Sequence, residues 1–204
     1  MFQYLILFLF LGIEGFAIFV LAAGMGLYFG FMRKLPQPKF SSELRPDFTA
    51  VKKTKILTVY ITDFPAKIEN KAENAALIVP TQKQSDFRSF GLKTALRMPE
   101  VLASLQKTSR CTSFNFIVGN TGIISLAEFL ETSKTEFPIA RISVIEDFPD
   151  IGAEYKEALQ KLLRIQFFWK PVYAVSVLVN TITGGANFRK LRTLREKAKS
   201  WDSA

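Results

Sequence analysis

The sequence predicts a single-pass transmembrane helix at the N-terminus, followed by an α/β or mixed α+β globular domain and a basic C-terminal helix. Three observations support this prediction: an apolar run at the start, an alternation of β-branched runs with helical patterns after it, and a cluster of cations at the end. The chain therefore divides into an anchor at 1–32, a proline-rich basic linker at 33–53, an α/β domain at 54–186 and a basic amphipathic tail helix at 187–204.

The apolar run at 2–32 contains one charged side chain, Glu14. About 20 apolar residues at 1.5 Å each cross a hydrocarbon layer of roughly 30 Å, so this run is long enough to span. A signal peptide is the alternative, because Ala22, Ala23 and Gly24 resemble a cleavage site. No basic residue precedes the run, however, and it continues to Phe31, so we favour an uncleaved span.

The flanking charges predict the orientation of this helix. All 27 lysines and arginines lie after residue 32, beginning with Arg33. The positive-inside rule then places the N-terminus outside and the domain on the cytosolic, matrix or stromal side. Inner mitochondrial, thylakoid and bacterial inner membranes all fit this orientation.

The single cysteine, Cys111, cannot form an intramolecular disulfide, and without histidine to activate it we expect an idle thiol.

Small residues recur along the anchor at nearly helical spacing, and the last two form a GxxxG motif. Such a face admits another helix at close range, although glycine is also common in membrane helices generally. We predict helix packing through Gly12, Gly15, Ala22, Gly26 and Gly30. Glu14 lies within the span, where an ionised carboxylate is costly, so it either meets a partner in the membrane, is neutral, or lies near enough to the head groups to stay hydrated.

The linker contains Pro36, Pro38 and Pro46 and shows no regular hydrophobic period. After it, β-branched runs predict strands at 55–61, 75–79, 113–118, 139–145 and 172–179. Helical patterns lie at 87–106 with a break at Pro99, at 124–132 and at 151–168. An antiparallel pairing of the first two strands would make the sheet mixed. The apolar stretch at 165–182 is interrupted and too short to span, so it is expected in the core, with an aromatic cluster at the bilayer interface as the alternative.

One turn in the domain has the position of a ligand site. Gly119, Asn120, Thr121 and Gly122 follow a predicted strand and precede a predicted helix, where α/β folds bind anions and nucleotides. The spacing matches neither GxGxxG nor the Walker pattern, and an ordinary strand-to-helix turn also uses these residue types.

Three acids, Glu146, Asp147 and Asp150, follow the predicted strand at 139–145. Carboxylates at this edge of a parallel sheet can hold Mg²⁺. The alternative, which we favour, is that they surround the N-terminus of the next helix, where its dipole favours negative charge.

The tail alternates cations with Phe188, Leu191 and Leu194. This pattern suits the head groups of anionic lipid or an acidic protein surface, and the alternative is a terminal helix docked by its leucines. Nucleic acid is disfavoured, because no aromatic stacking module is present. The predicted binding residues are Arg189, Lys190, Arg192, Arg195, Lys197 and Lys199.

The absence of histidine excludes His-based zinc sites, His-based triads and His-ligated haem, and we expect no cofactor or metal and no catalytic residues. The first functional hypothesis is an accessory or scaffold subunit of a larger membrane complex. The second is a membrane-tethered enzyme or small-ligand-binding domain that uses the 119–122 turn. The third is a tether to anionic lipid.

Overall fold

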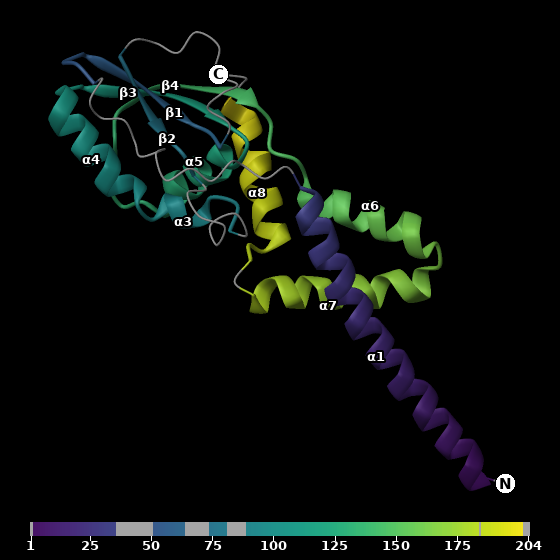
Figure 1. Cartoon of the computed structure of the whole chain (residues 1–204). Helices are drawn as coiled ribbons and strands as arrows, with labels where there is room; N and C mark the ends of the chain where they lie inside the picture. The colour runs from purple at the N-terminus through teal and green to yellow at the C-terminus, as the bar shows by residue number, and fades with distance from the viewer. Residues whose placement is uncertain (1, 36–50, 64–73, 81–88, 184, 202–204) are drawn as a thin grey trace. The chain divides into compact units, whose positions relative to one another are not determined.

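The computed structural model describes residues 2–35, 51–63, 74–80, 89–183 and 185–201. The chain forms two compact units (Figure 1). One combines Met1–Pro36 with Ile151–Phe188, and the other combines Gln37–Asp150 with Arg189–Ala204. We call them the helical unit and the sheet unit. The predicted 54–186 domain thus covers residues of both, and most of the predicted linker lies outside the described residues.

The sheet unit has the predicted α/β class. Strands β1 (Ile56–Ile61), β2 (Ala75–Ile78), β3 (Ser113–Gly119) and β4 (Ile139–Glu146) form a parallel sheet in the order β2-β1-β3-β4. The antiparallel pairing considered for the first two strands is wrong, since Thr58 pairs in parallel with Ala75. The 13 residues between β1 and β2 are enough for a parallel crossover, which needs about a dozen.

Helices α3 (Leu92–Ala95) and α4 (Met98–Ser109) lie in the connection from β2 to β3, and α5 (Thr121–Thr132) lies in the connection from β3 to β4. The break predicted at Pro99 is confirmed, because Pro99 lies at the start of α4. Helix α5 packs on β1 and β3, where Phe114, Phe116 and Val118 alternate into the core. These contacts hold the N-terminus of α5 at the carboxyl edge of the sheet.

The helical unit consists of α1 (Phe2–Lys34), α6 (Ile151–Leu163) and α7 (Gln166–Ile182). Within α1 the stretch Phe10–Lys34 is long and apolar enough to cross a membrane by length and composition. The strand predicted at 172–179 is wrong, because these residues belong to α7. Its buried positions Val172, Ser176 and Asn180 recur every four residues, as a helix packing along one stripe requires. The predicted 151–168 helix ends early, where Arg164 adopts a positive φ of 45°.

Helices α1 and α7 pack through matching four-residue rows. On α1 the buried residues are Val20, Gly24, Tyr28 and Met32, and they face the buried row of α7. Gly24 is essential to this contact, since a Cβ at this position would lie 2.6 Å from Val175 Cγ1. The two backbones therefore approach more closely than any larger residue would permit.

Hydrogen bonds join the three helices inside this contact. Ser176 Oγ donates to Gly24 O at 3.0 Å and to Val172 O at 2.8 Å, and it lies 2.6 Å from Tyr155 Oη on α6. Because the single serine proton points to these carbonyls, Tyr155 must donate to Ser176. One turn further, Tyr28 Oη donates to Asn180 Oδ1 at 2.5 Å. The buried polar groups of the helical unit are thus paired across helices.

Tyr155 should make the stability of the helical unit sensitive to alkaline pH. Burial raises the pKa of Tyr155 from 10 to about 12, so between these values the unfolded state has lost a proton that the folded state retains. The free energy of unfolding therefore falls as pH rises through this window, by about 2 kcal/mol in total. Denaturation of the full chain in detergent between pH 8 and 12 should show this decline, and Tyr155→Phe should lack it. A Tyr60→Phe control in the sheet unit should retain it, and equal slopes for Tyr155→Phe and wild type would refute the assignment.

Candidate functional site

The predicted turn at 119–122 lies at the topological switch point of the sheet. The connection that leaves β1 leads to β2 on one side of the sheet, whereas the connection that leaves β3 leads to β4 on the other side. The two connections therefore run in opposite directions from the carboxyl ends of the adjacent strands β1 and β3. Open parallel sheets bind ligands at such a point. The residues that meet here are Asp63, two positions after β1, and Thr121, at the start of α5. Both are buried, and Thr121 Oγ1 donates a hydrogen bond to Asp63 Oδ2.

Asn120 is the most unusual residue of the turn. Its backbone has φ 53° and ψ −127°, a combination that side chains other than glycine rarely adopt. The strain is maintained on both sides, because Asn120 N donates to Glu146 O at 3.0 Å and Asn120 O accepts from Ile123 N at 3.1 Å. Its side chain makes no capping hydrogen bond to α5.

Strained turns from a parallel strand into a helix present the nucleophilic serine in α/β hydrolases. Here the strained position carries a carboxamide, which is not a nucleophile, and the chain has no histidine to act as its base. The turn therefore has the backbone of a reactive elbow without the side chains that acyl transfer requires. The carboxamide of Asn120 can hydrogen-bond a ligand but cannot attack one.

The two glycines of the turn are explained by packing. A Cβ at Gly122 would lie 1.9 Å from Ile61 O, and one at Gly119 would lie 3.1 Å from Ile145 Cγ1. Gly122 thus lets α5 approach β1, and Gly119 lets β4 approach β3. Two grooves in the described part of the sheet unit, of about 760 and 200 Å³, lie along β4, and neither is bordered by the turn.

The acids after β4 pair with arginines of the tail. Arg195 Nη2 lies 2.7 Å from Asp147 Oδ2, and Arg192 Nε lies 4.0 Å from Asp150 Oδ2. Across the residues that the structure describes, no group of three or more acids, histidines and cysteines is placed to hold a metal ion. The arrangement therefore uses these carboxylates to hold the tail, which neither sequence interpretation considered.

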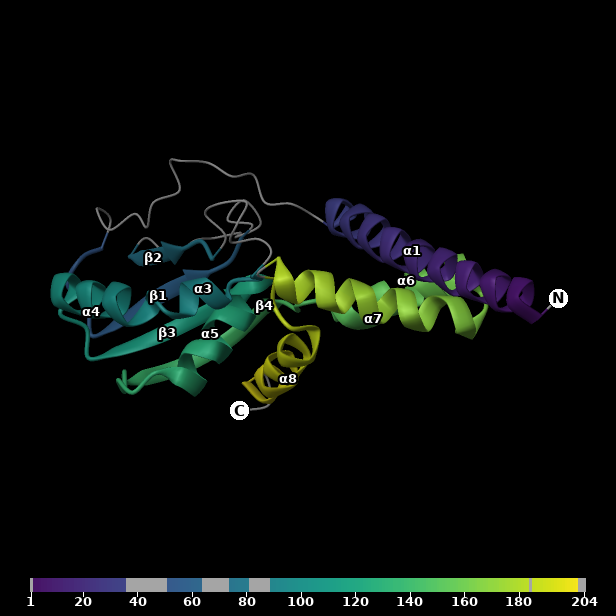
Figure 2. The same cartoon turned by 90° about the horizontal axis from the view of Figure 1, so that it is seen from below.

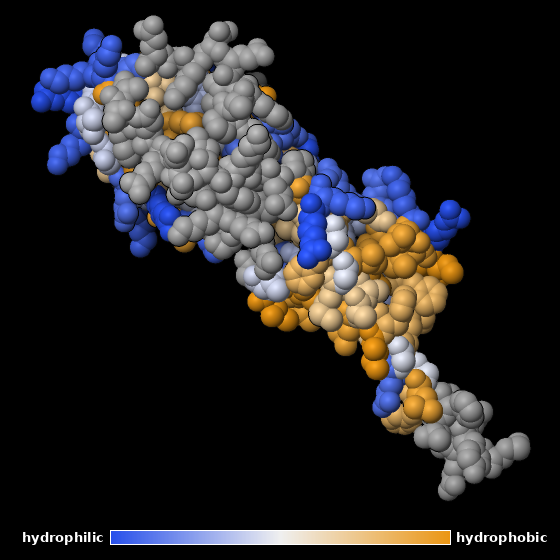
Figure 3. All heavy atoms as spheres, viewed as in Figure 1, coloured by the Kyte–Doolittle hydropathy of each residue, from blue (hydrophilic) through white to orange (hydrophobic). Residues whose placement is uncertain are grey.

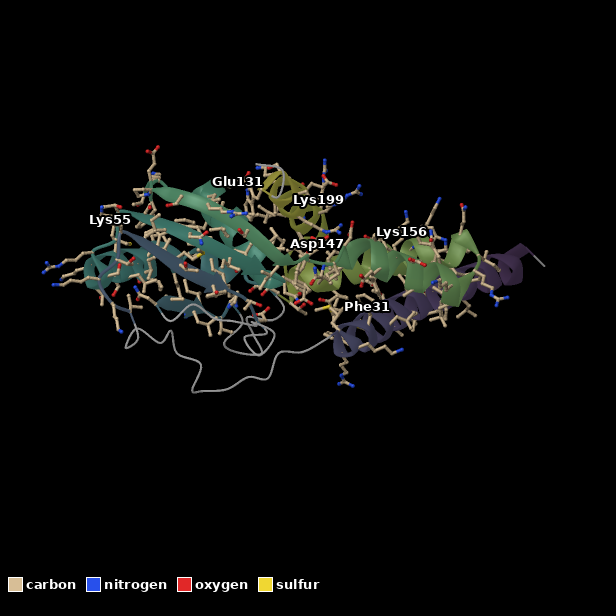
Figure 4. The ribbon with its side chains drawn as sticks, turned by 90° about the horizontal axis from the view of Figure 1, so that it is seen from above. Phe31, Lys55, Glu131, Asp147, Lys156 and Lys199 are labelled. Carbon is tan, nitrogen blue, oxygen red and sulfur yellow. The ribbon has the colours of Figure 1, made fainter. Side chains whose placement is uncertain are left out.

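The basic tail forms α8 (Phe188–Ala198) and a short 3₁₀ helix (Lys199–Trp201). In the sheet unit its apolar row, Leu191, Leu194 and Ala198, is buried. Its cations meet α5, since Lys190 Nζ lies 2.6 Å from Glu128 Oε1 and Lys197 Nζ lies 2.9 Å from Glu131 Oε1 (Figure 4 labels Glu131, Asp147 and Lys199).

Most cations of α8 form ion pairs with acids of the same sheet unit. Hydrogen bonding to Lys197 lowers the pKa of Glu131, which keeps that carboxylate ionised. Four of the six predicted binding cations, Lys190, Arg192, Arg195 and Lys197, have a carboxylate partner within the sheet unit. Anionic lipid or an acidic protein would have to compete with these partners.

Among the residues that the structure describes, none covers the small-residue face of α1. A Cβ at Gly12, Gly15, Gly26 or Gly30 would meet nothing within 4 Å, and Ala22 is exposed. Ala22, Gly26 and Gly30 each follow a residue of the buried row by two positions, which is about 200° of rotation around the helix. They therefore lie on the opposite side of α1 from α7. Glu14 is also exposed.

Sequence reasoning missed the residues that organise both units. Gly24 was noted only as part of a cleavage signal, although its spacing of four from Val20 and Tyr28 could have identified the inner row. Asp63 could have been found as the acid that follows the first strand.

Cys111 is buried and free. Comparison with protein-family models, curated proteins and solved structures finds no match to this chain.

The strain at Asn120 can be measured by replacing the residue with glycine. Asn120→Gly should raise the free energy of unfolding by about 1 kcal/mol, because the relief of strain exceeds the extra chain entropy of glycine. Asn120→Val should lower it, since a β-branched residue tolerates this conformation least. A loss of stability in Asn120→Gly would show instead that the carboxamide makes stabilising contacts.

The pair between Lys190 and Glu128 should matter more than the other tail ion pairs. Glu128 is buried, so Lys190→Met leaves its carboxylate without a cation, and we expect a loss of about 1–2 kcal/mol, less than for a fully buried pair because Lys190 is half-exposed. Adding Glu128→Leu should recover most of this loss. Arg192→Met is the control and should change urea denaturation little, because its pair with Glu196 is exposed and its contact with Asp150 is long, at 4.0 Å.

Proposed function

We propose that this protein is a non-catalytic accessory subunit of a larger membrane complex, anchored by α1. The observation that carries the proposal is that the other described residues cover α1 only along one row of its C-terminal half and leave most of its apolar surface exposed. Phe10, Ile13 and Ile18 are 62, 58 and 67% exposed, and Figure 3 shows apolar residues gathered over the helices of this unit. An uncovered apolar helix of this length needs lipid or another protein around it.

The orientation proposed for the anchor follows from its flanks. Arg33 and Lys34 form the last turn of α1, and no lysine or arginine precedes it. The positive-inside rule then supports a domain on the cytosolic, matrix or stromal face.

The sheet unit supports a binding role over a catalytic one. Its strained turn carries Asn120 instead of a nucleophile, and its acids Asp147 and Asp150 are paired with the tail.

The partner surface proposed here is the open stripe of α1, formed by Ala22, Gly26 and Gly30, where small side chains let a neighbouring transmembrane helix approach closely.

A second candidate function is binding of a small ligand at the switch point. The strained Asn120 and the buried pair of Asp63 and Thr121 favour it, because strain of this kind concentrates at ligand sites. A ligand site predicts that Asn120→Gly weakens ligand binding, whereas the subunit proposal predicts that the variant remains in the complex; both predict the gain in unfolding free energy.

The subunit proposal can be tested through the open stripe. Gly26→Leu with Gly30→Leu adds bulk where the chain itself has space, so the fold should persist while partners are lost. Native gels after mild detergent extraction should show the wild type in one complex of fixed stoichiometry and the double variant released from it.

Two controls interpret this experiment. Ala17→Leu is exposed on a different side of α1 and should remain in the complex. Gly24→Leu should disrupt the helical unit itself, because it collides with Val175. A wild-type chain that migrates alone would refute the subunit proposal, whereas a double variant that stays bound would refute only the stripe.

A further inference from the structure

Helix α1 is longer than a bilayer is thick, so the proposed anchoring leaves open which part is embedded. Its 33 residues extend about 50 Å at 1.5 Å each, whereas the hydrocarbon layer measures about 30 Å. Roughly 13 residues must therefore lie outside the hydrocarbon at one end or the other. The contacts and charges of α6 and α7 decide between the two ends.

The α6–α7 hairpin accompanies only the C-terminal half of α1. Its turn lies at the level of Phe16 and Phe19. The ring centroids of Phe16 and Phe167 are 5.1 Å apart, and those of Phe19 and Phe168 are 6.2 Å apart. Its open end lies at Phe31, whose ring is 4.9 Å from Tyr155. Figures 1 and 2 both show α1 continuing beyond this turn toward the N-terminus.

Charge distinguishes the two halves. The hairpin carries six charged side chains alongside the C-terminal half of α1, and the N-terminal half carries only Glu14. Each charge at hydrocarbon depth is costly unless it is paired or hydrated. Embedding the half of α1 that the hairpin accompanies would take all six into or next to the hydrocarbon, namely Glu154, Lys156, Glu157, Lys161, Arg164 and Lys170.

The hairpin turn has the composition of a membrane interface. Leu162, Ile165 and Phe167 are 61, 58 and 67% exposed. The cations Lys161, Arg164 and Lys170 alternate with them and are also exposed. Apolar side chains that enter the acyl boundary beside cations that reach phosphates are typical of segments lying on anionic lipid.

We infer that the hydrocarbon boundary crosses α1 near Phe19 and that the α6–α7 turn rests on the lipid head groups at this level. The embedded part is then about residues 2–19, roughly 27 Å long. The rest of α1, from Val20 to Met32, is a stalk outside the hydrocarbon that α6 and α7 cover on one side. This inference rests on the proposed membrane anchoring.

The boundary gives Glu14 and the small residues distinct surroundings. Glu14 lies five residues below Phe19, about 8 Å from the boundary, where its carboxylate can be hydrated from the head-group side. Gly12 and Gly15 lie within the hydrocarbon, whereas Gly26 and Gly30 lie on the stalk. A partner helix that follows the whole stripe must therefore extend beyond the bilayer as α1 does.

Cysteine labelling of the full chain in phosphatidylcholine–phosphatidylglycerol vesicles tests the boundary. Ile13 and Met25 are both exposed in the protein, so a difference between them reports the surrounding lipid. In a Cys111→Ser background, Met25→Cys should react with a membrane-impermeant maleimide at least about tenfold faster than Ile13→Cys. Equal protection of both sites, with the protein resistant to carbonate, would overturn the boundary and leave the anchoring intact. Rapid labelling of both sites in protein that carbonate extracts would overturn the anchoring itself.

Fluorescence quenching tests the hairpin turn separately. With Trp169→Phe and Trp201→Phe removing the native indoles, Phe167→Trp should be quenched most by lipids brominated near the head group. Leu178, which is 56% exposed and lies toward the other end of α7, provides the matched control, and Leu178→Trp should be unaffected. Strongest quenching by deep bromines, or no quenching of Phe167→Trp, would overturn the placement of the turn.

Discussion

The close approach of α7 to α1 at Gly24 is the contact on which the helical unit depends. Without a side chain at this position, the backbone carbonyl of Gly24 comes within hydrogen-bonding distance of Ser176, and Ser176 in turn accepts from Tyr155 on α6. The same serine thus connects three helices. Because buried polar groups need partners, this network also specifies the register of α7 along α1, with Tyr28 opposite Asn180 one turn further.

The sheet unit is closed by its own tail. Helix α8 buries Leu191 and Leu194 and places Lys190, Arg195 and Lys197 on acids of α5 and of the segment after β4. These cations of the tail are therefore less available to an external partner than their sequence pattern suggests. Two of the three acids that suggested a metal site, Asp147 and Asp150, pair with two of the six cations that suggested a lipid site, Arg195 and Arg192.

Several helices, strands and turns could be predicted from the sequence because each depends on a short pattern of neighbouring residues. The parallel strands follow short β-branched runs, Pro99 marks a helix start, and a 119–122 turn of glycine and small polar residues connects a strand to a helix. The segment at 172–179 has the same β-branched content and is helical. Its neighbour α1 offers a groove that matches a four-residue row, and tertiary packing of this kind overrides a β-propensity of about 1 kcal/mol or less.

Composition and short periodic patterns are sufficient to predict the apolar N-terminal segment with its basic flank and the α/β class, and the sequence contains no histidine. The packing of distant segments is needed to show that Gly24 rather than Gly26 faces α7, that α6 and α7 belong with α1, and that the tail cations bind acids of the sheet unit. Those choices depend on which distant surfaces fit together, and a pattern along the chain shows that a face must be covered without showing what covers it.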